Sequence, residues 1–68
     1  MPRVSKRIQL LQAAATIVDE QGSEYLTLDA VAKKAGVSKG GLLYHFQNKF
    51  ALIQGLVDHA DELYRNNV

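Results

Sequence analysis

Apolar residues recur every three or four positions through the first third of the chain, which predicts an amphipathic helix over about residues 4–21. Two overlapping apolar rows run along it, and together they comprise Ile8, Leu10, Leu11, Ala14, Ala15, Ile17 and Val18. A stripe this wide is typical of a helix covered by two neighbours. Ser5 and Pro2 offer competing starts, and Gly22 stands where a left-handed cap usually ends a helix.

A second, shorter helix is predicted over 28–35, after a loop in which Tyr25 and Leu26 are expected to lie under the core. Thr27 supplies a capping hydroxyl, and Asp29 in the first turn complements the helix dipole. Gly36 ends this helix. Its inward face comprises Leu28, Val31, Ala32 and Ala35, while Lys33 and Lys34 point outward.

The third predicted helix, over 39–46, has fewer aliphatic residues than a core helix would carry. Ser38 is a good N-cap, and Leu42, Leu43 and Phe46 form the expected buried side, while Lys39, Gly40, Gly41 and Tyr44 face outward. Each of the two glycines costs about 1 kcal/mol relative to alanine inside a helix. We therefore expect this helix to be the loosest of the four, and either packing holds it in place or the glycines serve a function.

The fourth predicted helix covers 49–65, capped by Asn48, with an apolar stripe at 52, 53, 56, 57, 60, 63 and 64. Leu63, Tyr64 and Val68 have little left in this chain to pack against, which suggests that a further domain follows. No strand pattern competes. The fold class is therefore all-α: a small bundle of four helices, made of a homeodomain-like three-helix core and the start of a fourth helix.

Length and composition narrow the function classes. Sixty-eight residues make one domain, 1–68, whose core is expected to supply no more than about 3–5 kcal/mol. Without cysteine there is no disulfide or thiolate metal site, and no apolar run approaches the ~20 residues that span a membrane. Residues 1–6 lack the apolar run of a secretory signal. We expect a cytoplasmic protein that does not associate with membranes.

Charge is distributed unevenly although the net charge is only +1. Residues 1–50 hold seven basic and four acidic side chains, a balance of +3, whereas residues 51–68 hold one basic and three acidic side chains, a balance of −2. A basic front and an acidic tail suit a protein that meets a polyanion with one end.

The segment 27–46 has the features of a helix-turn-helix. Ala32 lies four residues before Gly36, where two helices cross closely, and Val37 can fill the space between them. Such a unit places its second helix in the DNA major groove, with the N-terminal residues nearest the base edges. An ordinary helical hairpin satisfies the same spacing. The outward residues favour DNA: Lys39, Gly40, Gly41, Tyr44 and His45.

These residues resemble the DNA-binding domain of the Tet repressor family of bacterial transcription regulators. The resemblance is carried by Leu10-Leu11-Gln12-Ala13-Ala14, Thr27 to Ala32, Ala35-Gly36-Val37-Ser38-Lys39-Gly40, Tyr44-His45-Phe46, and Asn48-Lys49 followed by Ala51-Leu52. It covers about residues 6–57. It implies a homodimeric repressor of a palindromic operator, with a larger downstream domain, absent from this chain, that binds a small-molecule inducer. The isolated domain is expected to be monomeric.

Three positions depart from the family pattern. Gly41 stands where the family usually has a threonine or serine, Leu43 replaces a commonly aromatic residue, and Phe50 replaces a frequent acidic residue. The Gly41 change removes a hydroxyl group from the side expected to face DNA, and the Leu43 change either removes a tyrosine hydroxyl from that side or shifts it to Tyr44. These departures do not affect the fold assignment, but they affect which residues are expected to read bases.

The candidate DNA-binding residues are Lys39, Gly40, Gly41, Tyr44, His45, Lys49, Ser38, Thr27, Arg3, Lys6 and Arg7. Lys39 is expected to contact a base or a phosphate, and Lys49 a phosphate at a helix N-terminus. Tyr44 suits a phosphate contact or half-buried packing, and His45 suits DNA or packing equally. The N-terminal cations form either a basic arm for phosphates and the minor groove or a frayed terminus.

Catalysis finds no support in the sequence. His45 and His59 are fourteen residues apart without carboxylates arranged as a ligand set, so neither a metal nor another cofactor is expected. The alternative function is a small helical module whose apolar fourth-helix end binds a protein partner. Salt dependence separates the two, because binding through several phosphates weakens steeply with salt.

Overall fold

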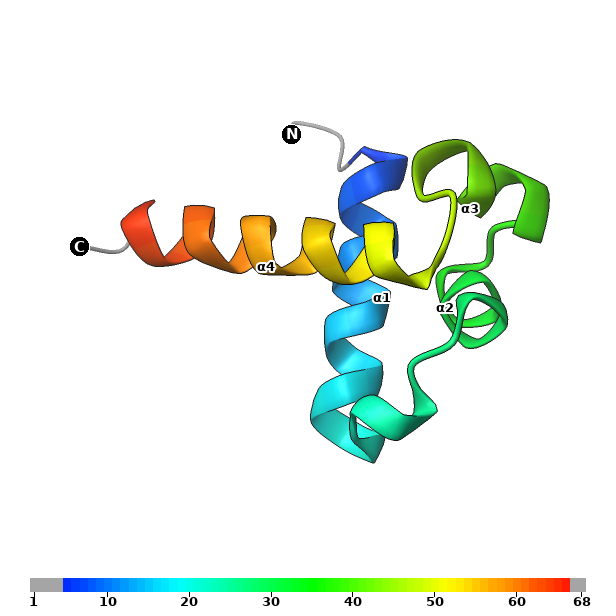
Figure 1. Cartoon of the computed structure of the whole chain (residues 1–68), viewed down its shortest axis with the longest axis horizontal. Helices are drawn as coiled ribbons and strands as arrows, with labels where there is room; N and C mark the ends of the chain where they lie inside the picture. The colour runs from blue at the N-terminus through cyan, green and yellow to red at the C-terminus, as the bar shows by residue number, and fades with distance from the viewer. Residues whose placement is uncertain (1–4, 67–68) are drawn as a thin grey trace.

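The computed structural model describes residues 5–66, which form four α-helices and one short 3₁₀ helix with no strand among them. In chain order these are α1 (Lys6–Gln21), η1 (Ser23–Tyr25), α2 (Leu28–Ala35), α3 (Lys39–His45) and α4 (Lys49–Asn66) (Figure 1). The predicted all-α class with four helices is confirmed. α3 ends one residue earlier than predicted, with Phe46 as its C-cap, and Val4 lies outside the described residues.

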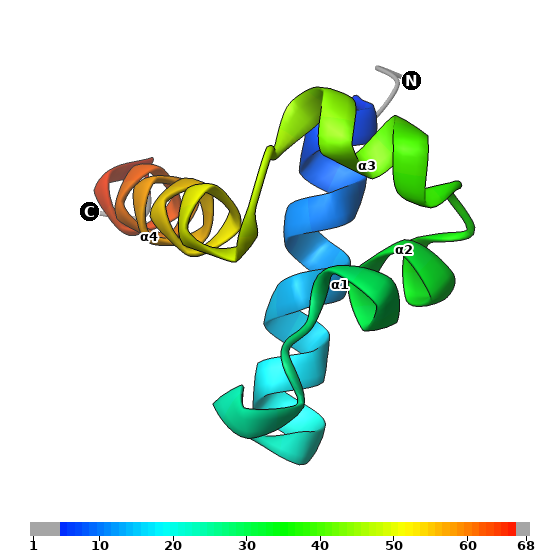
Figure 2. The same ribbon diagram turned by 45° about the vertical axis from the view of Figure 1, so that its right-hand side comes forward.

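The helices are arranged around α1. α2 and α3 lie on one side of it, while α4 crosses α1 and runs away on the other side (Figures 1 and 2). The C-terminal part of α4 therefore projects away from the helix-turn-helix, and α3 lies at the opposite edge of the molecule.

All four helices contribute to one core. The largest fully buried side chains are Leu10 and Leu11 of α1, Val31 of α2, Leu42 of α3 and Leu52 of α4. The other buried apolar residues are Ala13, Ala14, Ile17, Leu26, Ala32 and Phe46. α1 supplies five of these eleven residues, which agrees with its predicted wide stripe, although Ala15 is exposed.

A side-chain cap begins each α-helix, and all four predicted capping residues are confirmed. Ser5 Oγ accepts from the Ile8 amide at 3.1 Å, Thr27 Oγ1 from Ala30 at 3.0 Å, Ser38 Oγ from Gly41 at 3.0 Å, and Asn48 Oδ1 from Ala51 at 2.8 Å. Caps of this kind contribute about 0.5–2 kcal/mol each relative to alanine. For α3, only seven residues long, the cap is a large share of its local stability.

The turn between α2 and α3 uses the left-handed conformation expected of Gly36, with φ 72° and ψ 31°. The Val37 amide donates to the Ala32 carbonyl at 3.0 Å, and the Gly36 amide donates to Lys33 at 3.2 Å. These bonds satisfy the last carbonyls of α2, as in a Schellman cap. The turn sets α3 against α2 at a defined angle.

Several apolar residues predicted to pack are exposed instead. Tyr25 is 59% exposed because the short helix η1 carries it outward, and only Leu26 fills the core there. Leu43 is 37% exposed, since the buried side of α3 is narrow and is taken by Leu42 and Phe46. On α4, Ile53 and Val57 are exposed too. The side chains of Leu63, Tyr64 and Val68 lie outside the described residues.

Gly55 has a packing role that the sequence pattern did not reveal. It is buried where α4 crosses α1, and a Cβ there would lie 2.8 Å from Phe46 Cε1 and 3.4 Å from Leu11 Cδ2. Contacts under 3.0 Å force neighbouring atoms to move. The missing side chain therefore lets α4 approach α1 and the end of α3 closely.

Candidate nucleic-acid interface

The N-terminal turn of α3 presents small and basic residues to solvent. Lys39 and Gly40 are exposed, and a Cβ at Gly40 would meet nothing within 4 Å. Gly41 was predicted to face outward, but it is half-buried: a Cβ there would lie 3.0 Å from Val37 Cγ1 and 3.2 Å from Ser38 Oγ. Only the first of the two glycines therefore leaves open surface through which a ligand can approach the backbone.

Tyr44 and His45 follow on the exposed side of α3. Tyr44 is 87% exposed, so the half-buried alternative is wrong, and His45 is exposed as well. The two rings meet edge to face, with centroids 5.3 Å apart and planes at 86°. This contact orients the rings against each other while leaving the Tyr44 phenol open to a hydrogen-bond acceptor such as a phosphate oxygen.

A second basic position lies at the start of α4. Lys49 is the first residue of this helix and is exposed, and Asn48 caps the helix beside it. Helix N-termini attract anions because their free N–H groups and the helix dipole point toward the ligand. Phe50 next to it is 76% exposed. The start of α4 thus combines a cation, helix amides and an aromatic ring near the end of α3.

Lys39 is engaged in an ion pair that sequence reasoning did not anticipate. Its Nζ lies 3.1 Å from Oδ1 of Asp29, in the first turn of α2. Asp29 was assigned only to the helix dipole, because ten residues and a turn separate the pair in sequence. The helix-turn-helix geometry brings the first turns of α2 and α3 within reach of each other.

The three N-terminal cations differ in what the structure shows of them. Arg3 lies outside the described residues, whereas Lys6 and Arg7 form the first two positions of α1 and are exposed, so a frayed terminus does not describe them. The Arg7 guanidinium carbon is 5.4 Å from the centre of the Phe46 ring, a cation–π contact. Arg7 therefore bridges α1 and the end of α3.

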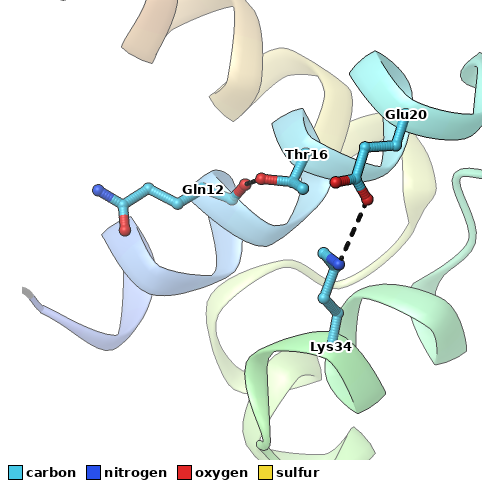
Figure 3. A network of polar contacts seen from close by, with 4 residues as sticks. All are labelled: Gln12, Thr16, Glu20 and Lys34. Atoms are coloured by element: carbon cyan, nitrogen blue, oxygen red, sulfur yellow. Dashed lines mark hydrogen bonds and ion pairs between the residues drawn. The ribbon is translucent and has the colours of Figure 1, made fainter.

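The remaining lysines, Lys33 and Lys34, lie in the last turn of α2. Lys34 Nζ is 3.7 Å from Glu20 Oε1 in the last turn of α1, and Thr16 Oγ1 donates to the Gln12 carbonyl at 2.9 Å (Figure 3). Lys33 is exposed. Both lysines border an open groove of about 320 Å³ lined also by Ile17, Gln21 and Ala30, with no residue of α3 among them.

Other kinds of site are not found in the part of the chain that the structure describes. No three histidine, cysteine, aspartate or glutamate side chains of residues 5–66 gather into a possible metal site. Within the same residues, no helix has the length and apolar character needed to cross a bilayer. The exposed face of α3 and the start of α4 therefore form the candidate binding surface, because they combine exposed cations, an exposed phenol and a helix N-terminus.

Residues 10–56 match the family described as bacterial regulatory proteins, tetR family. The chain belongs to this family. The matched segment runs from Leu10, in the core part of α1, to Leu56 on α4, and so includes the whole helix-turn-helix. The resemblance noted from the sequence is confirmed, and with it the assignment as a helix-turn-helix domain of a DNA-binding transcriptional regulator.

Relatives in the tetR family agree with this assignment. The chain is 31% identical over 61 residues to the nucleoid occlusion factor SlmA of Shewanella loihica, covering 90% of this chain and 31% of the relative. It is 38% identical over 56 residues to the HTH-type transcriptional regulator TtgR of Pseudomonas putida, covering 82% of this chain and 27% of the relative. The chain thus spans about a third of the length of these relatives. No solved structure matches it.

Proposed function

We propose that this chain is the DNA-binding part of a tetR-family transcriptional repressor, and that it inserts α3 into the major groove of double-stranded DNA. The observation that carries this proposal is the composition of the exposed face of α3. A helix that packed against another protein layer would show mainly aliphatic residues there. The exposed residues of α3 are instead Lys39, Gly40, Tyr44 and His45, with Leu43 as the one aliphatic residue among them. Helix-turn-helix proteins read bases with the N-terminal residues of the equivalent helix.

In the proposed complex the contacts divide into two groups. The start of α3, with Ser38, Lys39 and Gly40, lies closest to the base edges, and the small Gly40 lets the backbone approach the groove. Lys49, Tyr44 and the cations of α1 bind phosphates, which position the protein without reading sequence. Thr27 and Gly41 then act through structure, since Thr27 caps α2 and Gly41 faces Val37.

The properties of the whole protein are part of the same proposal. The regulators named above are about three times longer than this chain. We infer a cytoplasmic homodimer that binds a palindromic operator, represses by excluding polymerase, and releases DNA when a small molecule binds a further domain. The present chain alone is expected to be monomeric and to bind DNA weakly, because the avidity of two half-sites is lost.

Lys49→Ala provides the test. We expect binding to all DNA sequences to weaken alike, and the slope of log K against log salt concentration to fall by about one unit, since one phosphate contact is removed. Fluorescence anisotropy with a mixed-sequence duplex at several salt concentrations measures this. Lys33→Ala, which removes an equal charge from the α2 surface, is the control and should leave the slope unchanged. Equal slopes for wild type and Lys49→Ala would remove Lys49 from the phosphate contacts.

A second function is favoured by one observation on α4. Phe50, Ile53 and Val57 are exposed apolar residues that recur at helical spacing. Such a stripe suits a protein partner, and binding through it would depend little on salt. Wild-type chain that shows no salt-dependent DNA binding would favour this partner function over the DNA-binding one.

A further inference from the structure

The ion pair between Asp29 and Lys39 places a carboxylate beside the first residue of the recognition helix. Its two charged atoms are 3.1 Å apart, and both side chains are mostly exposed, at 76% for Asp29 and 56% for Lys39. Exposed pairs contribute little to folding stability. The pair therefore needs another explanation than stability, and its location suggests one.

The position of Asp29 relative to α3 is fixed by the fold. Thr27 caps α2 two residues before it, and Val31, fully buried two residues after it, anchors the same turn in the core. The left-handed Gly36 then sets the direction of α3. The carboxylate thus belongs to the rigid frame, whereas the flexible lysine stem adapts to it.

On DNA without a preferred sequence, this carboxylate opposes binding. Lys39 would otherwise gain a phosphate contact, but its charge is already matched by Asp29, and the carboxylate itself is repelled by phosphates within a Debye length of about 8 Å. Both effects penalise contacts that any DNA sequence offers. Non-specific affinity is therefore lower than the cations of α3 and α4 alone would produce.

A guanine edge changes this balance. The lysine ammonium has three N–H donors and no acceptor, so one bond to Asp29 leaves two donors free. Guanine presents two acceptors, O6 and N7, in the major groove, and carries no full negative charge to repel the carboxylate. Lys39 can therefore keep its Asp29 contact while it donates to a guanine.

We propose that Asp29 is a specificity-determining residue that acts through Lys39, directing the lysine to guanine and away from phosphates. The inference rests on the proposed DNA-binding function and deepens it. Asp29 is a positioning residue here and contacts no base itself. Its substitution should therefore raise affinity for arbitrary DNA while it lowers selectivity.

The experiment compares wild type, Asp29→Ala, Lys39→Ala and the double variant of the 68-residue chain. Affinity for a mixed-sequence duplex is measured against salt, and preferred sites are selected from a random duplex pool. For Asp29→Ala we expect mixed-sequence binding to strengthen about threefold at low salt and the salt slope to steepen by about 0.9, as for one added phosphate contact. One guanine preference of about fivefold or more in the wild-type sites should disappear.

Two control variants separate this effect from charge removal in general. Glu20→Ala removes the same charge from the Glu20–Lys34 pair, which joins the ends of α1 and α2 instead of the start of α3 (Figure 3). We expect it to change mixed-sequence affinity by less than about twofold, well below the effect of a phosphate contact. Asp29→Glu restores a carboxylate and should retain the guanine preference. Circular dichroism checks that each variant is folded.

The outcomes are distinguishable. The inference is supported if the double variant selects the same sites as Lys39→Ala, and if Asp29→Ala raises mixed-sequence affinity clearly more when Lys39 is present than when it is absent. It is overturned if Asp29→Ala has the same effect with and without Lys39, because Asp29 would then act by its own charge, or if Asp29→Ala selects the wild-type sites unchanged. Wild-type chain that shows neither salt-dependent binding nor site selection overturns the proposed function itself.

Discussion

The two ends of α3 are built in opposite ways. At its C-terminal end, Leu42 and Phe46 are buried, and Phe46 lies between Gly55 of α4 and the Arg7 guanidinium of α1. At its N-terminal end, Lys39 and Gly40 are exposed, and the Ser38 side chain caps that turn. α3 is thus anchored at one end and exposed at the other.

This contrast explains how a seven-residue helix with two glycines can exist. Short helices are marginal by themselves, and most helical stability in proteins comes from the packing of a buried face. In α3 that packing is concentrated at one end. The other end is left free to carry residues chosen for a ligand, and the predictions below test each end separately.

Removing the anchor should have the largest effect. Phe46→Ala deletes a buried ring, a change that costs about 3–5 kcal/mol. A core of this size rarely supplies more than about 3–5 kcal/mol, so the loss is as large as the whole stability and the variant should be largely unfolded at 25 °C. Helical circular dichroism and urea titration measure this.

Phe50→Ala is the matched control, since it removes an identical side chain that is 76% exposed. We expect it to change stability by no more than about 0.5 kcal/mol. If Phe46→Ala remained folded with native stability, α3 would not depend on its C-terminal anchor, and the contrast between the two ends would be lost.

A smaller perturbation of the same end is Gly55→Ala. The added methyl group would lie 2.8 Å from Phe46 Cε1, so the ring or α4 must shift. Overpacking of this kind costs about 1–3 kcal/mol, and the higher helix propensity of alanine offsets about 1 kcal/mol of it. The net loss lowers the melting temperature by roughly 4–8 °C per kcal/mol in a domain of this size. Thermal melting followed by circular dichroism provides the measurement. An unchanged melting temperature would show that α4 can shift on α1 to accommodate the methyl group without loss of stability.

Gly55 also shows where sequence reasoning stops. Periodicity and capping residues sufficed for the four helices because both act within a few residues, as in the Ser38–Gly41 cap. The role of Gly55 depends on three helices meeting, and the ion pair of Asp29 with Lys39 depends on the angle of a turn. Neither leaves a local pattern in the chain.

The same distinction applies to the exposed aromatic and aliphatic residues. Tyr25 precedes the buried Leu26, and Leu43 follows the buried Leu42, so burial was predicted for both, yet the narrow buried faces of η1 and α3 leave them exposed. Of the α3 residues predicted to face outward, Lys39, Gly40 and Tyr44 are exposed and Gly41 is half-buried, while their contacts with DNA stay a prediction. Which of them contacts bases depends on the complex and not on the free chain.

The smallest predicted effect concerns the exposed end, where the two neighbouring glycines of α3 should respond differently to alanine. Gly40→Ala places a methyl group in open space and should stabilise the domain by up to about 1 kcal/mol, the helix propensity difference. Gly41→Ala should gain less or nothing, because its methyl group would press on Val37 Cγ1 at 3.0 Å.

Amide hydrogen exchange reports this at the level of the helix. In the wild-type chain we expect the amides of residues 42–46 in and after α3 to exchange faster than those in the middle of α1, since the exposed end opens readily. Gly40→Ala should slow exchange in α3 selectively, whereas Gly41→Ala should not. Two outcomes would contradict this: α3 amides of the wild type that are as protected as those of α1, or equal slowing of exchange by both substitutions. Either would show that the N-terminal turn of α3 is held as firmly as its anchored end.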